Sequence, residues 1–388
     1  MDSEELRDGD EIDAHINAES YQQPPDAPQL DLALDENNIN AESASKDESY
    51  QQPPEDTQLD LALGSVFGAF IGDALGSYIE FKKHINTKLL KETLEMNGGG
   101  PFQLGPGQVT DDSELAMCML RGLCDGNGKL NLDSIAYYYK QWICTGPFDI
   151  GNTTSNALGV YRNSEPIAKL SIDSASIYNQ NSQSNGSFMR CTPMAVFCRN
   201  LSDQEIRQAV TLESSMTHSN LDVQDAQVCY IKAIVSLLRD PGNRVRAYEE
   251  AKAMATSLNT QEWFEDVENP KKAMKGSPNI GWVKIAFDHA FRHLRNNSDF
   301  ETAMSETLKL GGDTDTNAAI VGGLIGAAVG FKRLPYEWKD KVMKYSFAST
   351  NRGIIRPSFL NQLEVEEQVK YLFSISPSSL KVRPKGLI

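Results

Sequence analysis

Two short acidic clusters, far apart in the sequence, carry the residues most able to do chemistry. Each stands immediately before a stretch with the apolar spacing of a helix, in GQVTDDSELAMCML and in LGGDTDTNAAIVGG. Neighbouring carboxylates repel one another unless a cation or a proton separates them. Every side-chain donor in both clusters is a hard oxygen, which favours Mg²⁺ or Mn²⁺ over zinc. The candidate ligands are Thr110, Asp111, Asp112, Asp313, Asp315 and Thr316.

A simpler explanation of either cluster alone is a helix cap, because Asp and Thr side chains at a helix start accept hydrogen bonds from first-turn N–H groups. A third segment, VFGAFIGDALGSYIEF, places Asp73 inside an apolar helix, where it needs a partner, and Glu80 where the helix opens into a loop. Either carboxylate has a purely structural alternative. The glycine-containing turns FDIGNTT and NGSFMRCTP are of a kind that can approach a phosphate or a sugar closely.

The elements that must position these residues are predicted to be helices. Segments such as DAQVCYIKAIVSLLRD and WVKIAFDHAFRHLRN space their apolar residues by three and four, and few segments alternate as strands do. We expect a mostly α-helical domain over residues 59–388. We expect loops near residues 97–109, 145–153, 176–187 and 258–280.

The first 58 residues differ from the rest in composition. Residues 1–60 hold 18 acidic and 2 basic side chains, so the remainder has 35 of each, from totals of 53 and 37. ESYQQPPDAPQLDLAL, beginning at Glu19, returns as ESYQQPPEDTQLDLAL at Glu48, a period of 29 residues. We interpret residues 1–58 as a disordered acidic tail that solubilises the domain, with a docking motif as the alternative. The neutral body argues against nucleic acid as a partner.

Cysteine spacing and hydropathy indicate the compartment. The six cysteines show no CxxC spacing, and we find no leader with a basic and then an apolar region. The longest apolar run has 14 residues, from Ala318 to Phe331, which is short of the roughly 20 that a membrane-spanning helix needs. We therefore expect a cytoplasmic protein, with the nucleus as the alternative, and no membrane association.

Taken in order, GAFIGDALGSYIEF, GQVTDDSELA, FDIGNTT, NGSFMR, SMTHSN and GGDTDTNAAIVGGLIGA resemble the ADP-ribosylglycohydrolase family. The likeness is greatest to its branch typified by the dinitrogenase reductase-activating glycohydrolase, and it covers roughly residues 62–350. It implies an orthogonal all-α bundle with a binuclear metal cleft. Two divalent cations, Mg²⁺ or Mn²⁺, would be bound by the six candidate ligands.

The resemblance also implies roles for further residues. Glu80 and Asp149 would be the catalytic carboxylates beside the ribose. The substrate-binding residues would be Asn185, Gly186, Ser187 and His218. Ser113 stands where many members have threonine.

The function implied is metal-dependent hydrolysis of the bond between ADP-ribose and a modified protein side chain, with an arginine linkage favoured over serine because of DIGNTT. We expect an ADP-ribosylated protein as substrate and a monomeric enzyme. The alternative is a non-catalytic relative that binds ADP-ribose or serves a structural role, as the family's lens-crystallin members do. A third hypothesis is a hydrolase of another small ADP-ribose compound or of ADP-ribosylated nucleic acid.

Overall fold

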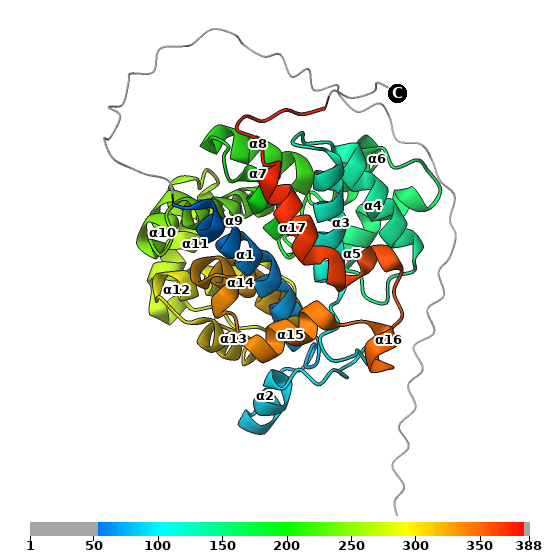
Figure 1. Ribbon diagram of the computed structural model, residues 1–388. Helices are drawn as coiled ribbons and strands as arrows, with labels where there is room; N and C mark the ends of the chain where they lie inside the picture. Colours follow the sequence, from blue (N-terminus) through cyan, green and yellow to red (C-terminus); the bar gives the residue numbers. More distant parts are fainter. Residues whose placement is uncertain (1–52, 384–388) are drawn as a thin grey trace, which may run out of the picture. The chain divides into compact units, whose positions relative to one another are not determined.

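Helices account for nearly all the regular structure of residues 53–383, the part of the chain that the computed structural model describes (Figure 1). The only β-type pairings in these residues are three isolated bridges. The predicted all-α fold is therefore confirmed. The α-helices are α1 (Glu55–Gly76), α2 (Thr87–Leu94), α3 (Asp111–Asp125), α4 (Leu132–Cys144), α5 (Asn152–Leu158), α6 (Ala168–Tyr178), α7 (Thr192–Cys198), α8 (Asp203–Ser214), α9 (Leu221–Arg239), α10 (Arg244–Ala253), α11 (Leu258–Glu268), α12 (Val283–Arg295), α13 (Phe300–Leu308), α14 (Thr314–Val329), α15 (Tyr336–Lys344), α16 (Phe347–Thr350) and α17 (Val365–Ser374). Short 3₁₀ turns are η1 (Gly159–Arg162), η2 (Pro270–Lys272), η3 (Phe331–Arg333), η4 (Ser358–Leu360) and η5 (Gln362–Glu364).

The first helix begins inside the predicted tail. α1 starts at Glu55, so the second copy of the repeat supplies its first two turns, and Leu61, Ala62 and Leu63 of the LDLAL segment are buried. Residues 55–63 of this copy are therefore part of the folded domain, because their apolar side chains pack against its core. The first copy of the repeat lies outside the described residues.

The predicted loop at 258–280 is wrong over its first half, where α11 forms. Ser257 caps this helix by accepting a hydrogen bond from the Thr260 N–H at 3.0 Å. Trp263, Phe264 and Val267 are buried against neighbouring helices. Burial of these three side chains, at helical spacing, outweighs the charged residues between them.

Glycines let α1 and α14 pack in unusually close contact. Gly64, Gly68, Gly72 and Gly76 recur every four residues along α1 and face Gly326, Gly322, Ala318 and Asp315 of α14 in turn. A Cβ atom on any of the four would overlap with the backbone of α14. The two helices run antiparallel, so the C-terminal end of α1 meets the N-terminal end of α14. This end brings Asp73 and Asp315 together.

α9 completes the centre of the bundle beside α1 and α14 (Figure 1). Its residues Val223 to Leu238 are all buried, and the Tyr230 hydroxyl donates to the Ile320 carbonyl of α14 at 2.7 Å. Among the helices described, α1 alone is long and apolar enough to cross a membrane. However, 89% of its most apolar window is buried inside the protein, as expected for a core helix.

Candidate active site

The side chains at the N-cap positions of α3 and α14 do not cap their helices. Thr110 and Asp313 occupy the two N-cap positions, and neither side chain accepts a hydrogen bond from its own helix. At ordinary helix starts of this chain, such as Asn86, Ser202 and Asp299, the N-cap side chain does accept one. Capping therefore does not explain Thr110 or Asp313.

Asp73 ties α1 to the start of α3. Its carboxylate accepts hydrogen bonds from the backbone N–H of Thr110, at 3.0 Å, and from that of Ser113, at 3.2 Å. The hydroxyls of the same two residues donate to it at 2.9 Å and 2.6 Å. Thr110 and Ser113 are thus the partners that Asp73 needs in its apolar surroundings, and these contacts place the first cluster against α1.

Two groups of three carboxylates share Asp315. Oxygen atoms of Asp73, Asp112 and Asp315 all lie within 4.8 Å of one another, and so do those of Glu80, Asp149 and Asp315. The members come from α1, the turn that follows it, the start of α3, the loop before α5 and the start of α14. Tertiary packing therefore joins the two acidic clusters and both predicted catalytic carboxylates in one site.

The remaining predicted ligands border these groups. The Thr110 hydroxyl lies 3.2 Å from Asp112 Oδ2, and Asp111 lies at hydrogen-bonding distance from Asp149. Asp313 accepts a hydrogen bond from the Asn185 side chain at 2.7 Å. The Thr316 N–H donates to Asp315 Oδ1 at 2.9 Å.

Burial and mutual repulsion hold protons on this cluster when no cation is present. Burial, together with the charges of Asp149 and Asp313, raises the pKa of Glu80 to about 9. Burial, followed by repulsion from neighbouring carboxylates, raises the pKa values of Asp111, Asp112 and Asp315 well above their ordinary range. Such a cluster has a high affinity for positive charge.

The donor set fits a divalent cation. Asp112 Oδ1 and Glu80 Oε2 are buried and have no hydrogen-bond partner among the described residues. An unsatisfied buried carboxylate oxygen is costly, and a bound cation would satisfy it. Because all the donors are carboxylate or hydroxyl oxygens, the site suits a hard ion.

Asn185 connects the predicted substrate loop to the acidic cluster. Besides donating to Asp313, it accepts the Phe188 N–H at 2.9 Å and donates its own N–H to the Gly281 carbonyl at 3.1 Å. Gly281 has a φ of +79°, and a Cβ atom there would lie 3.6 Å from Asp313 Oδ2. The loop at 184–188 is therefore held at the edge of the site.

The His218 side chain contacts this loop through Ser184. Its Nε2 lies 2.8 Å from the Ser184 hydroxyl and its Nδ1 lies 2.7 Å from the Thr217 hydroxyl, so both ring nitrogens have protein partners. Burial, with the nearby charge of Arg190, lowers the pKa of His218 well below its usual value, which keeps the ring neutral. A direct contact of His218 with substrate stays a prediction.

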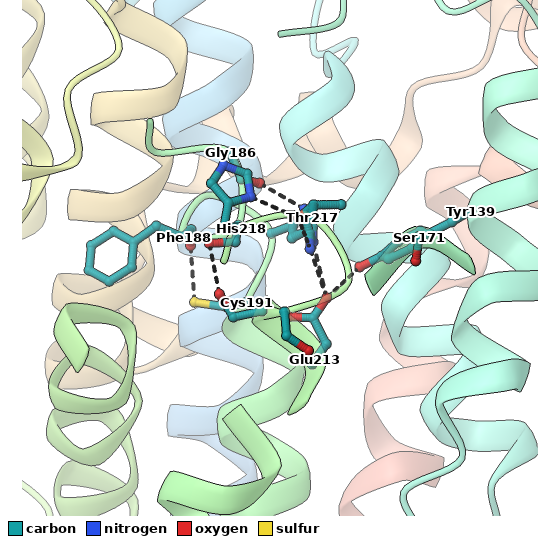
Figure 2. A network of polar contacts seen from close by, with 12 residues as sticks. Tyr139, Ser171, Gly186, Phe188, Cys191, Glu213, Thr217 and His218 are labelled. Carbon is teal, nitrogen blue, oxygen red and sulfur yellow. Dashed lines mark hydrogen bonds and ion pairs between the residues drawn. The ribbon is translucent and has the colours of Figure 1, made fainter. Parts of the chain in front are cut away.

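A buried ion pair holds the same loop, and Figure 2 shows its surroundings at Gly186, Glu213, Thr217 and His218. Arg190 and Glu213 are fully buried and lie 3.0 Å apart. The Arg190 guanidinium also donates to the Gly186 carbonyl at 3.1 Å and to the Thr217 hydroxyl at 2.8 Å. Ser187 is buried, and the Ser214 hydroxyl lies 3.3 Å from its own.

The loop that carries Asp149 is braced by Arg356, from the segment before η4. The Arg356 guanidinium lies 5.5 Å from the ring centre of Phe148 and donates to both oxygens of Glu114 on α3, at 2.6 and 2.9 Å. Glu114 also accepts the Trp142 indole N–H at 2.8 Å. Sequence patterns did not reveal this brace or the Arg190–Glu213 pair. Phe148, Glu114 and Arg190 lie within quoted motifs, but the partners that join them are distant in sequence and lie in other segments.

Comparison with known proteins places this site in a family. The sequence model of ADP-ribosylglycohydrolase matches residues 54–368. The chain belongs to the ADP-ribosylglycohydrolase family. The predicted enzyme class is thereby confirmed.

Individual ADP-ribosylglycohydrolase relatives agree with this assignment. The chain is 30% identical to the ADP-ribosylarginine hydrolase Tri1 of Pseudomonas putida (strain GB-1), over 72% of this chain and 73% of the relative. It is 27% identical to the ADP-ribosyl-[dinitrogen reductase] glycohydrolase of Rhodospirillum rubrum, over 72% and 89%. A solved structure described as an ADP-ribosylglycohydrolase-related protein complex has the same fold, with a TM-score of 0.64 and 22% identity over 83% of this chain and 99% of the other.

Proposed function

We propose that this chain hydrolyses the bond between the anomeric carbon of ADP-ribose and a modified protein side chain, with ADP-ribosyl-arginine favoured over ADP-ribosyl-serine. The observation that carries the proposal is the pair of carboxylate groups sharing Asp315, with orphaned oxygens on Asp112 and Glu80. The printed names of two relatives, an ADP-ribosylarginine hydrolase and a dinitrogen reductase glycohydrolase, support the substrate class.

The proposal includes two divalent cations, Mg²⁺ or Mn²⁺, at the six predicted ligands, with Asp73 beside them as the residue that positions Thr110 and Ser113. Bound there, the cations would position the ribose hydroxyls and lower the pKa of a bound water. Side chains and backbone groups of the chain would bind the rest of the ADP-ribose. Asn185 and the backbone at Gly186 would position the diphosphate, with the Arg190–Glu213 pair fixing that loop.

Glu80 and Asp149 are two carboxylates of the site that are not among the six predicted metal ligands, and they could transfer protons in the reaction. Cleavage of a glycosidic bond develops positive charge on the sugar and requires a proton for the leaving group and a base for the water. Both side chains lie within 4.8 Å of Asp315, on two different loops. We propose that one orients the water and that the other serves the leaving group, without assigning the two roles.

The test is release of ADP-ribose from matched peptides modified on arginine or on serine, with Mg²⁺, with Mn²⁺ and with EDTA. We expect faster release from the arginine peptide and none in EDTA. Tight binding of free ADP-ribose with no release from either peptide would instead indicate a non-catalytic ADP-ribose-binding protein. Equal rates in EDTA and Mg²⁺ would contradict the metal dependence.

We propose a monomeric, cytoplasmic enzyme. All six cysteines are free in the structure, which is the usual state in a reducing compartment. Size-exclusion chromatography with light scattering tests the first point, and imaging of a fluorescent fusion tests the second.

A further inference from the structure

Two lysine-bearing loops pack on either side of the glycine turn that precedes Asp313. On one side, the Phe81 N–H donates to the Gly312 carbonyl at 2.8 Å, and the Gly312 N–H donates to the Lys82 carbonyl at 2.9 Å. On the other side, Gly276 packs so closely on Gly311 and Gly312 that a Cβ atom would overlap with backbone. Both loops are therefore fixed beside the active site by backbone contacts.

Five exposed lysines on and next to these loops form what we call the basic rim. Its members are Lys82, Lys83, Lys271, Lys275 and Lys309. Residues 81–91 and 269–284 contain no Asp or Glu. No ion pair joins a lysine of the basic rim to a carboxylate of the described chain, whereas the neighbouring Lys272 and Lys284 both pair with Asp266.

The basic rim is a local concentration of charge. Residues 61–388 are neutral overall, with 35 acidic and 35 basic side chains. Unpaired like charges gathered on one rim raise the local concentration of an oppositely charged partner and speed its association. These lysines are exposed to solvent and form no ion pairs with the buried carboxylates of the site.

Exposed apolar side chains lie among the lysines. Phe81, with 55% of its surface exposed, adjoins Lys82, and Ile280, 43% exposed, lies across Gly312. A surface that combines apolar anchors with unpaired lysines matches a polypeptide carrying both apolar and acidic residues better than it matches a uniform phosphate polymer.

We propose that the basic rim docks acidic residues that flank the modified side chain of the protein substrate. This inference rests on the proposed function and adds to it a substrate class, proteins modified within an acidic surface. The rim contributes to capture of the protein and not to the chemical step, so its effect lies in kcat/KM for protein or peptide substrates.

The experiment compares three peptides of equal length that carry the same ADP-ribosylated arginine flanked by Glu, by Gln or by Lys. Free ADP-ribosyl-arginine is the fourth substrate, because it keeps the diphosphate and lacks the polypeptide. We expect kcat/KM to fall in the order Glu, Gln, Lys, by roughly three- to tenfold from first to last, and the difference to shrink above about 0.3 M salt.

Charge reversal assigns the preference to the rim. The double variant Lys83→Glu/Lys271→Glu should lose the preference for the Glu peptide and keep the wild-type rate on free ADP-ribosyl-arginine. Lys129→Glu/Lys381→Glu is the matched control, because both lysines are exposed, lack ion pairs among the described residues and lie beyond the far end of α3. This control should retain the full preference.

Two results would overturn the basic rim as a docking surface. One is equal kcat/KM for the three peptides, and the other is an equal loss on free ADP-ribosyl-arginine in the rim variant, which would mean that the lysines serve the diphosphate. No release from any substrate would contradict the proposed function instead. In that case fluorescence anisotropy of the three labelled peptides on the same protein still decides whether the rim binds acidic sequence.

Discussion

Gly72 of α1 lies against the carbonyl oxygen of Ala318 on α14 so closely that any side chain at Gly72 would overlap with it. The neighbouring residue Asp73 and the facing residue Asp315 belong to one carboxylate group. The distance between the two helices therefore sets the geometry of the site.

We predict that Gly72→Ala destabilises the protein and lowers its activity. Forcing the helices apart costs about 1–3 kcal/mol or more, which exceeds the helix propensity that alanine gains, about 1 kcal/mol. Thermal unfolding measures the first effect and ADP-ribose release the second. Gly159→Ala is the control, because a Cβ atom at Gly159 meets nothing within 4 Å; a loss of stability in the control equal to that of Gly72→Ala would refute the packing argument.

Asp315→Asn should abolish turnover and also remove the stabilisation that Mg²⁺ or Mn²⁺ gives the wild type. Asp315 belongs to both carboxylate groups, so its loss removes a donor from each. Ligands that bind only the folded state raise the melting temperature, so the two proteins should differ in their response to added metal. A variant with wild-type turnover at saturating metal would disprove the metal site.

Without metal, stability should fall as the pH rises. Burial raises the pKa of Asp73 to about 7 and that of Glu80 to about 9, so the folded state holds more protons than the unfolded state above about pH 4. Stability present below the unfolded pKa is then lost as the pH rises through these folded values. Melting temperatures in EDTA should decline between about pH 5 and about pH 9, and Mg²⁺ should reduce the decline. The same slope with and without Mg²⁺ would argue against cation binding at these carboxylates.

Glu213→Gln should be strongly destabilising, by about 3–5 kcal/mol, because it leaves the charge of Arg190 buried without its carboxylate. Both side chains are fully buried. Tyr139→Phe is the milder comparison, since it removes one hydroxyl that donates to Glu213 at 2.8 Å and leaves the ion pair in place. Denaturant unfolding ranks the two variants, and a smaller loss for Glu213→Gln than for Tyr139→Phe would contradict the role given to the pair.

His293 should contribute to instability in mild acid. Burial lowers the pKa of His293 from 6.5 to about 4, so the unfolded state binds a proton that the folded state does not. Stability present above pH 6.5 is lost as the pH falls from there towards 4, by roughly 1–2 kcal/mol at about pH 5. His293→Gln should lose less stability than the wild type over this range. His84→Gln, at an exposed position, should behave as the wild type.

Residue types and their order in the chain were enough to predict the helical fold and to single out the acidic clusters and Glu80. Asp149 was named only through the resemblance to the family. Apolar spacing reports burial of a helix face directly, and paired carboxylates are informative wherever they lie, because their repulsion needs an explanation. Two boundaries failed for the same reason: the starts of α1 and α11 depend on a core that the local sequence does not contain.

By itself, then, the sequence determined which side chains are available for chemistry and that helices carry them. Only the tertiary structure decided that Asp73 joins Asp112 and Asp315, that Asn185 contacts Asp313, that Arg190 pairs with Glu213, and that lysines from separate loops form one rim. These relationships depend on contacts between segments tens to hundreds of residues apart. Their geometry is set by how closely helices such as α1 and α14 pack. The glycines spaced every four residues along α1 permit this close approach, but only the fold decides that α14 is the helix packed against them.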